Sequence, residues 1–268
     1  MRRLDVDRLD FYQVWNVMRP EHWEQAVAPG GMIEGILKAR DEGLIDHVGF
    51  TAHDAPENLL RYLDEADWCE ILLLSYNLLN VRYAPVFEAA HRKGIGTIVM
   101  NPVGGGRLTG AVPALDALMG EAGATSAADL AIRFIMSNPN IDTIISGLTR
   151  LSDVDATIAS VCAGGLDEAA LDGVRRFIQD HAPADGGICN QCCYCFPCSQ
   201  GIDIIGYMLC VQDERIFGFG EAARRHYARI GPPKPDACAQ CGDCESRCPQ
   251  QLPIMDTLAY ALDRFGGK

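Results

Sequence analysis

The chain has 268 residues, of which 36 are acidic and 23 are basic, and its formal net charge is -13 at pH 7. A surface this acidic repels nucleic-acid phosphates and anionic lipids, so neither nucleic acid nor a membrane is an expected partner. The two arginines after Met1 precede no long apolar run, which disfavours a secretory signal and predicts a cytoplasmic location.

The first 164 residues alternate short apolar runs with longer amphipathic segments. Strands are predicted at 11–17, 47–51, 71–76, 97–100 and 143–146. Helices are predicted at 31–43, 56–64, 84–93, 126–137 and 152–162. This alternation predicts an α/β fold with parallel strands, either a (β/α) barrel or an open doubly wound sheet. No G-x-G-x-x-G sequence follows the first strand, which favours a partial TIM-type barrel of about five βα units.

A polar helix is predicted at 167–180, and a linker-like stretch and a sharp change of composition follow it. Ten of the twelve cysteines lie from Cys189 onward. Clustered cysteines in a chain without an export signal are typical of metal ligands. We therefore predict a partial barrel at 1–164, a connecting helix at 165–182 and a small, helix-rich, cysteine-rich domain at 183–268.

The last cysteine motif reads Cys238-Ala-Gln-Cys241-Gly-Asp-Cys244-Glu-Ser-Arg-Cys248-Pro249. It has the C-x2-C-x2-C-x3-C-P spacing of bacterial ferredoxins, in which three thiolates hold one cluster and the fourth ligates the other. The alternative is zinc, but zinc ribbons separate two C-x2-C knuckles by a long insert. The spacing favours iron–sulfur and predicts a ferredoxin-type domain.

An earlier motif supplies Cys189, Cys192 and Cys195 at the same spacing, with Cys198 one residue earlier than usual. Each motif thus has three regularly spaced cysteines and a fourth that is set apart. This pattern suggests that the motifs exchange their fourth ligands between two [4Fe–4S] clusters. One cluster would take Cys189, Cys192, Cys195 and Cys248. The other would take Cys238, Cys241, Cys244 and Cys198. Ligation without exchange is the alternative that the sequence leaves open.

The remaining four cysteines are not predicted to bind metal. Cys210 lies in a segment of helical period between the motifs and is expected in the core, as are Cys69 and Cys162. Cys193 stands between two predicted ligands and is expected to point away from them.

Several segments resemble the strands and loops of the later part of an aldo-keto reductase barrel. They are Asp10-Phe11-Tyr12, Gly49-Phe50-Thr51, Ser75 to Asn80, Asn101 to Leu108 and Ile145-Ser146-Gly147, which resemble the family's strands four to eight. In the tail, Gly201 to Ile204 and Pro249 to Ile254 also fit. Over nearly its whole length the chain resembles the ferredoxin-fused aldo-keto reductase group, predicted oxidoreductases of bacteria and archaea.

The resemblance implies that the chain starts about where the family's fourth strand starts. The family's catalytic Asp, Tyr and Lys, which belong to the first three strands, then have no counterpart, and Trp15 stands where its catalytic His is expected. An indole cannot act as the general acid of carbonyl reduction. The catalytic residues are therefore unknown, and NADPH-dependent carbonyl reduction by this chain alone is not expected.

For NADP(H), the resemblance points to the loops after strands seven and eight, where barrels commonly bind phosphate. The candidate residues are Gly104, Gly105, Gly106, Ser146, Gly147, Thr149 and Arg150. Ordinary turn chemistry is the alternative for the glycines. Met100 replaces the family's ring-stacking aromatic residue and Ala156-Thr157 its adenine-contacting pair, which argues against the cofactor. His53 is expected to be a solvated loop residue, the alternative being that it faces the pocket.

Together these features predict an iron–sulfur oxidoreductase related to aldo-keto reductases. Its two [4Fe–4S] clusters would pass electrons between a redox protein and a small-molecule substrate. The alternative is a non-catalytic electron-transfer or scaffold module with a degenerate barrel. Because five strands do not close a barrel, a second copy or a second chain completing it is a further predicted partner.

Overall fold

The computed structural model describes residues 3–110, 112–181 and 188–267. They form two compact units, each built from several stretches of the chain. The first unit comprises Met1–Tyr76, Val81–Pro102 and Asn138–Leu148, and the second comprises Asn77–Asn80, Val103–Ser137 and Thr149–Lys268. The boundaries expected from the sequence, at 164 and 182, stay a prediction. The linker expected at 181–187 lies outside the described residues, apart from His181 at the end of a helix.

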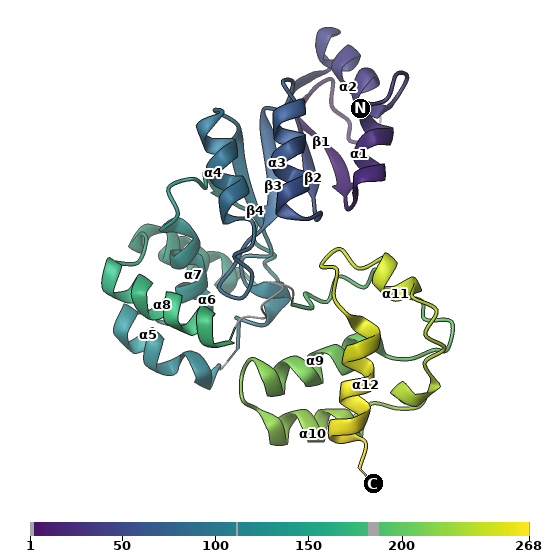
Figure 1. Ribbon diagram of the computed structural model, residues 1–268. Helices are drawn as coiled ribbons and strands as arrows, with labels where there is room; N and C mark the ends of the chain where they lie inside the picture. The colour runs from purple at the N-terminus through teal and green to yellow at the C-terminus, as the bar shows by residue number, and fades with distance from the viewer. Residues whose placement is uncertain (1–2, 111, 182–187, 268) are drawn as a thin grey trace. The chain divides into compact units, whose positions relative to one another are not determined.

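The first unit holds a five-stranded parallel sheet (Figure 1). Its strands are β1 (Leu9–Val17), β2 (Ile45–Ala52), β3 (Ile71–Ser75), β4 (Gly96–Met100) and β5 (Thr143–Ile144). They lie side by side in chain order, β1-β2-β3-β4-β5. A doubly wound sheet reverses its strand order at a switch point, whereas this order is that of consecutive barrel strands. The α/β prediction is confirmed, and the sheet is consistent with a partial TIM-type barrel.

The central strands are buried on both faces, as their continuous apolar sequences require. Val48 and Phe50 of β2 and Leu72 and Leu74 of β3 are fully buried. Gly49 lies where β2 pairs with Ile71 of β3, and a Cβ there would lie 1.9 Å from the Ile71 carbonyl oxygen. Only glycine therefore allows this approach of the two strands.

Four helices belong to the first unit: α1 (Pro20–Val27), α2 (Met32–Asp41), α3 (Pro56–Glu65) and α4 (Ala84–Arg92). Helix α2 packs on β2, and α4 packs on β4. The sequence did not predict α1, which starts with a proline and buries Trp23. The Trp23 ring stacks on Tyr62 at 4.5 Å, and its indole Nε1 donates to Glu65 at 2.6 Å.

The second unit is helical. Its helices are α5 (Asp116–Ala122), α6 (Ala127–Met136), α7 (Leu151–Ala163), α8 (Glu168–His181), α9 (Ile204–Arg215), α10 (Gly220–Arg229), α11 (Asp243–Ser246) and α12 (Ile254–Phe265), with 3₁₀ turns at Gly104–Gly106, Pro113–Leu115 and Pro235–Ala237. Helix α6 packs on α7, and α5 packs on α8. None of the helices in the described parts of the chain is long and apolar enough to cross a membrane.

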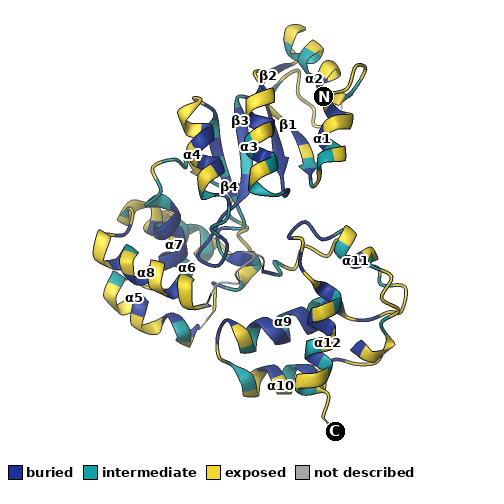
Figure 2. Ribbon diagram, in the orientation of Figure 1, coloured by how far each residue is buried: buried dark blue, intermediate teal, exposed yellow. Residues whose placement is uncertain are grey.

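Helix α9 is the centre of the cysteine-rich part. It packs against both α10 and α12 and is largely buried (Figure 2). The Asp203 side chain caps it by accepting from the Gly206 amide at 3.0 Å. The core around α9 contains Tyr207, Cys210 and Ile254 together with several of the clustered cysteines. This part is helix-rich, as the sequence predicts.

Candidate metal centres

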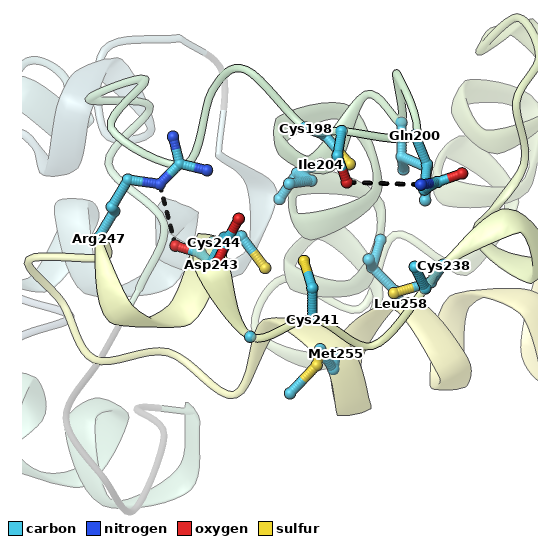
Figure 3. A pocket seen from close by; sticks show the side chains of 14 residues that line it. Cys198, Gln200, Ile204, Cys238, Cys241, Asp243, Cys244, Arg247, Met255 and Leu258 are labelled. Carbon is cyan, nitrogen blue, oxygen red and sulfur yellow. Dashed lines mark hydrogen bonds between the residues drawn. The ribbon is translucent and has the colours of Figure 1, made fainter.

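Two hollows in the second unit are walled by the clustered cysteines. The Cys238 hollow is walled by Cys198, Cys238, Cys241 and Cys244 and encloses about 370 Å³ of space open to solvent (Figure 3). The Cys189 hollow is walled by Cys189, Cys192, Cys195 and Cys248, with Cys193 as a fifth cysteine, and encloses about 330 Å³. Of the eight predicted ligands, each hollow takes three from one motif and the fourth from the other. This grouping is that of the exchanged alternative.

The backbone of both motifs turns sharply between the cysteines. Gln191, Cys193 and Gln240 have positive φ angles of 59°, 67° and 51°, and Gly242 has φ 77°. A left-handed residue reverses the direction in which the next side chains point. The three cysteines of each triplet can therefore reach one hollow although only two residues separate each from the next.

The cysteines of the two hollows differ in exposure. Cys195, Cys244 and Cys248 are buried, whereas Cys192 and Cys241 are exposed. Burial raises the pKa of the Cys195 thiol to about 12 and that of the Cys189 thiol to about 11. These two thiols are therefore neutral at pH 7 without metal, and a metal that binds them as thiolates must displace their protons.

The walls of the two hollows fit an iron–sulfur cluster. Each combines cysteine thiols with apolar side chains, among them Ile202, Met255 and Leu258 in one hollow and Met208 and Leu252 in the other. Within the described residues, no three His, Cys, Asp or Glu side chains form a group that could hold one metal ion. The thiols that line each hollow surround a space, and four thiolates are the ligand set of a cage of four irons.

The four cysteines that are not predicted to bind metal are Cys69, Cys162, Cys193 and Cys210. Cys210 and Cys69 are buried, as predicted, and burial raises the pKa of each thiol to about 12. Cys162 is exposed near the end of α7, so the prediction that it is buried is wrong. Cys193 is exposed and contributes to the wall of the Cys189 hollow, where its Sγ contacts the Gln191 carbonyl at 3.4 Å.

The predicted phosphate-binding glycines lie against the first cysteine motif. Gly104, Gly105 and Gly106 form a 3₁₀ turn with positive φ angles. The Gln191 side chain donates from Nε2 to the Gly105 carbonyl at 3.1 Å, and a Cβ on Gly105 would lie 2.3 Å from the Asn190 carbonyl oxygen. The absence of a side chain at Gly105 thus allows the loop to approach the backbone next to Cys189.

The other predicted phosphate contacts belong to the turn before α7. Ser146 and Gly147 are part of the first unit, whereas Thr149 and Arg150 are part of the second. Arg150 Nη2 contacts an Asp153 carboxylate oxygen at 3.0 Å, and Thr149 Oγ1 donates to Asp153 at 3.1 Å. These hydrogen bonds, that of Arg150 above all, lower the pKa of Asp153. Both side chains therefore stabilise the first turn of α7 through Asp153.

A buried polar group follows β2 in the first unit. His53 is buried rather than solvated, so that prediction is wrong, and its Nδ1 has no hydrogen-bond partner among the described residues. Burial, with a smaller effect of Arg82, lowers the pKa of His53 to about 4, so the ring is neutral at pH 7. Next to it, the Asp54 carboxylate accepts from the Tyr62 hydroxyl at 2.6 Å, and the Tyr83 hydroxyl donates to the Asp54 carbonyl at 2.9 Å.

Trp15, at the position of the expected catalytic histidine, lies on the edge strand β1, and its side chain is 71% exposed. An indole N–H can only donate a hydrogen bond, so this side chain cannot act as a general acid or base.

Two buried contacts of the second unit could not be predicted from the sequence. Asn80 Nδ2 donates to Gln250 Oε1 at 3.2 Å, and Arg107 pairs with Asp213. The partners are separated by 170 and 106 residues. No local pattern in the sequence links such distant positions.

The chain is similar in fold to solved aldo-keto reductases. The structures of AKR11C1 from Bacillus halodurans match with TM-scores of 0.54 (holo form) and 0.53 (apo form), at 20% identity over 65% of this chain and 60% and 64% of theirs. The thermostable aldo-keto reductase Tm1743, solved with the inhibitor epalrestat, matches with a TM-score of 0.52 at 17% identity, over 65% of this chain and 62% of its own. The chain thus spans 60% to 64% of the length of these structures.

No curated protein sequence matches the chain. The model of the Aldo/keto reductase family, in contrast, matches residues 1–178, which is well over half of the sequence. The match includes the whole parallel sheet. The chain belongs to the aldo/keto reductase family.

Proposed function

We propose that this chain is an iron–sulfur oxidoreductase of the aldo/keto reductase family that transfers electrons through two [4Fe–4S] clusters. One observation carries the proposal: the eight cysteines of the two ligand sets line two hollows, four in each, and each set takes one cysteine from the opposite motif. Four thiolates are the ligand set of a [4Fe–4S] cluster, and one cysteine taken from the opposite motif is typical of two-cluster ferredoxins.

The residues of the two hollows would bind the clusters and tune them. Cys189, Cys192, Cys195 and Cys248 are the proposed ligands of one cluster, and Cys198, Cys238, Cys241 and Cys244 those of the other. When bound, the clusters supply one-electron transfer. Apolar side chains such as Ile204, which lies between both hollows, keep water from the thiolates and reduce the local dielectric.

The proposal is tested by one-electron chemistry of the purified protein. Anaerobically prepared protein is expected to absorb broadly in the visible range, to lose much of this absorption with dithionite and to regain it with ferricyanide. The Cys162→Ser variant is the matched control, because this exposed cysteine is far from both motifs in sequence and should change nothing. A colourless protein that dithionite leaves unchanged would contradict the proposal and support zinc.

We further propose that the chain alone does not reduce carbonyl compounds with NADPH. Trp15 offers no proton to a substrate oxygen, and Arg150, the predicted phosphate contact, is paired with Asp153. We expect turnover of simple aldehydes with NADPH to stay well below the value of roughly 1 per second at the low end of typical enzymes. Steady-state NADPH oxidation measures this, with a complete aldo-keto reductase as the positive control, and turnover in that typical range would refute it.

The second candidate function is a non-catalytic electron-transfer module. The contact of Gly105 with the Asn190 backbone favours it, because a loop that binds the first cysteine motif is less free to bind a cofactor phosphate. A redox protein is the proposed partner in both cases. A small-molecule substrate is proposed only in the first.

A further inference from the structure

The two hollows have different surroundings. The Cys238 hollow is lined by residues between Cys198 and Leu258. Next to the Cys189 hollow, in contrast, lie two segments from much earlier in the chain, 77–80 and 103–107. In the sequence these segments directly follow Tyr76, beyond β3, and Pro102, beyond β4, and both belong to the same compact unit as the cysteines.

Gln250 is a buried amide in the wall of the Cys189 hollow. It is 3% exposed and follows the proposed ligand Cys248 by two residues. Its Oε1 accepts from Asn80, but its Nε2 has no partner among the described residues. A buried N–H donor without an acceptor destabilises the fold, because it has lost its hydrogen bond to water. An acceptor in the hollow would remove this cost.

Gln250 contacts a buried turn on its other side. Asn80 is 1% exposed and pairs with Asn77 through two backbone hydrogen bonds of 3.1 and 3.0 Å. Leu78 and Leu79 between them are buried, so the turn cannot move without exposing both leucines. In the structure the Asn80 amide donates to Gln250 Oε1, while Gln250 Nε2 and Asn80 Oδ1 have no partner among the described residues.

Arg107 places a positive charge near the same hollow. It follows the glycine turn that contacts Asn190 and Gln191, and it pairs with Asp213 in a site where both side chains are about one-sixth exposed. Its guanidinium also lies 5.2 Å from the centre of the Phe217 ring. Because the pair is shielded from water, its charges act on nearby groups more strongly than exposed charges do.

We propose that Gln250 Nε2 donates a hydrogen bond to the cluster of the Cys189 hollow, and that Arg107 and Asp213 are the charged pair that sets its potential. This inference rests on the proposed function. Reduction adds one electron, and hence one negative charge, to a cluster. A hydrogen bond to sulfur and a nearby cation stabilise that charge and raise the reduction potential, whereas a nearby carboxylate lowers it.

The two potentials are measured by redox titration of the full-length, anaerobically purified protein, followed by electron paramagnetic resonance. Gln250→Leu and Arg107→Gln are expected to lower the same one of the two midpoints. We expect about a tenfold change in the ratio of reduced to oxidised cluster at a fixed potential. For a one-electron couple this corresponds to a midpoint shift of about 59 mV. Asp213→Asn should shift the same midpoint in the opposite direction, and Arg107→Lys should leave it near the wild-type value.

The Cys238 hollow provides the matched control. Arg247 lines it and donates to the carbonyls of Phe196 and Pro197. Arg247→Gln is therefore expected to shift the other midpoint. Each variant is compared only if it keeps the iron and sulfide content of the wild type. If Gln250→Leu does not fold, Gln250→Glu replaces it, because this variant alters the charge and nearly keeps the size of the side chain.

The inference is overturned if the Gln250 and Arg107 variants shift neither midpoint, shift both equally, or shift the one that responds to Arg247→Gln. Midpoint shifts in the same direction for Arg107→Gln and Asp213→Asn would also overturn it. An electrostatic effect must change direction with the sign of the removed charge, whereas a structural disturbance need not. A wild-type protein without clusters would instead refute the proposed function. The two failures are thus distinguished.

Discussion

Cys248→Ala is expected to impair the cluster of the Cys189 motif, and Cys198→Ala that of the Cys238 motif. Cys248 lies in the hollow walled by Cys189, Cys192 and Cys195, and Cys198 lies in the other. Loss of one of four thiolates leaves one iron of the cluster without its protein ligand. We expect iron to fall from about eight per chain toward about four in each variant.

The assignment of each loss follows from two reference variants. Cys189→Ala and Cys241→Ala remove a ligand from the triplets themselves, so their spectra define the loss of each cluster. With exchange, the paramagnetic resonance spectrum of reduced Cys248→Ala should match that of Cys189→Ala, and that of Cys198→Ala should match that of Cys241→Ala. Cys210→Ala, which changes a buried cysteine outside both hollows, should keep both clusters. The opposite matches would show that each motif keeps its own fourth cysteine.

The full chain is expected to form a dimer through β1. In the described sheet β1 is an edge strand, with Phe11 63% and Trp15 71% exposed. An edge strand with exposed aromatic side chains favours pairing with another strand. We propose a second copy as the partner, because two identical edges can pair about a twofold axis, each offering the same groups to the other.

Trp15→Lys is expected to weaken this dimer strongly. Fully burying a large apolar side chain stabilises by about 1.5–3 kcal/mol, so each dimer, which buries two such residues, should lose at least tenfold in affinity. Light scattering after size-exclusion chromatography measures the mass as a function of concentration. Leu151→Lys is the control, since Leu151 is 86% exposed and begins α7, outside the sheet. A wild-type protein that is monomeric at all concentrations would contradict the proposal.

Much of the fold could be predicted because the relevant patterns are local. The run at 71–76 is apolar and β-rich, and the structure has β3 at Ile71–Ser75. The helix predicted at 84–93 is α4, and Gly94 follows it with φ +71°, the left-handed conformation typical of a helix end. Helix α1 was missed because its eight residues offer too few turns for a clear period.

The candidate site could be predicted only where spacing along the chain carries the information. The triplets of both cysteine motifs are of this kind. His53 and Cys162 were assigned to the wrong environments, because a single residue in a loop or on a helix has no pattern that reports its burial. The Asn80–Gln250 and Arg107–Asp213 contacts depend on how the chain folds back on itself, which no local pattern specifies.

The central claim is tested most directly by counting iron, acid-labile sulfide and zinc in the anaerobically purified full-length protein. Two [4Fe–4S] clusters predict about eight iron and about eight sulfide per chain, with little zinc. The count needs neither a substrate nor a partner, so it does not depend on how the chain acts in a larger assembly. Zinc in place of iron, or iron without an equal amount of sulfide, would contradict the account.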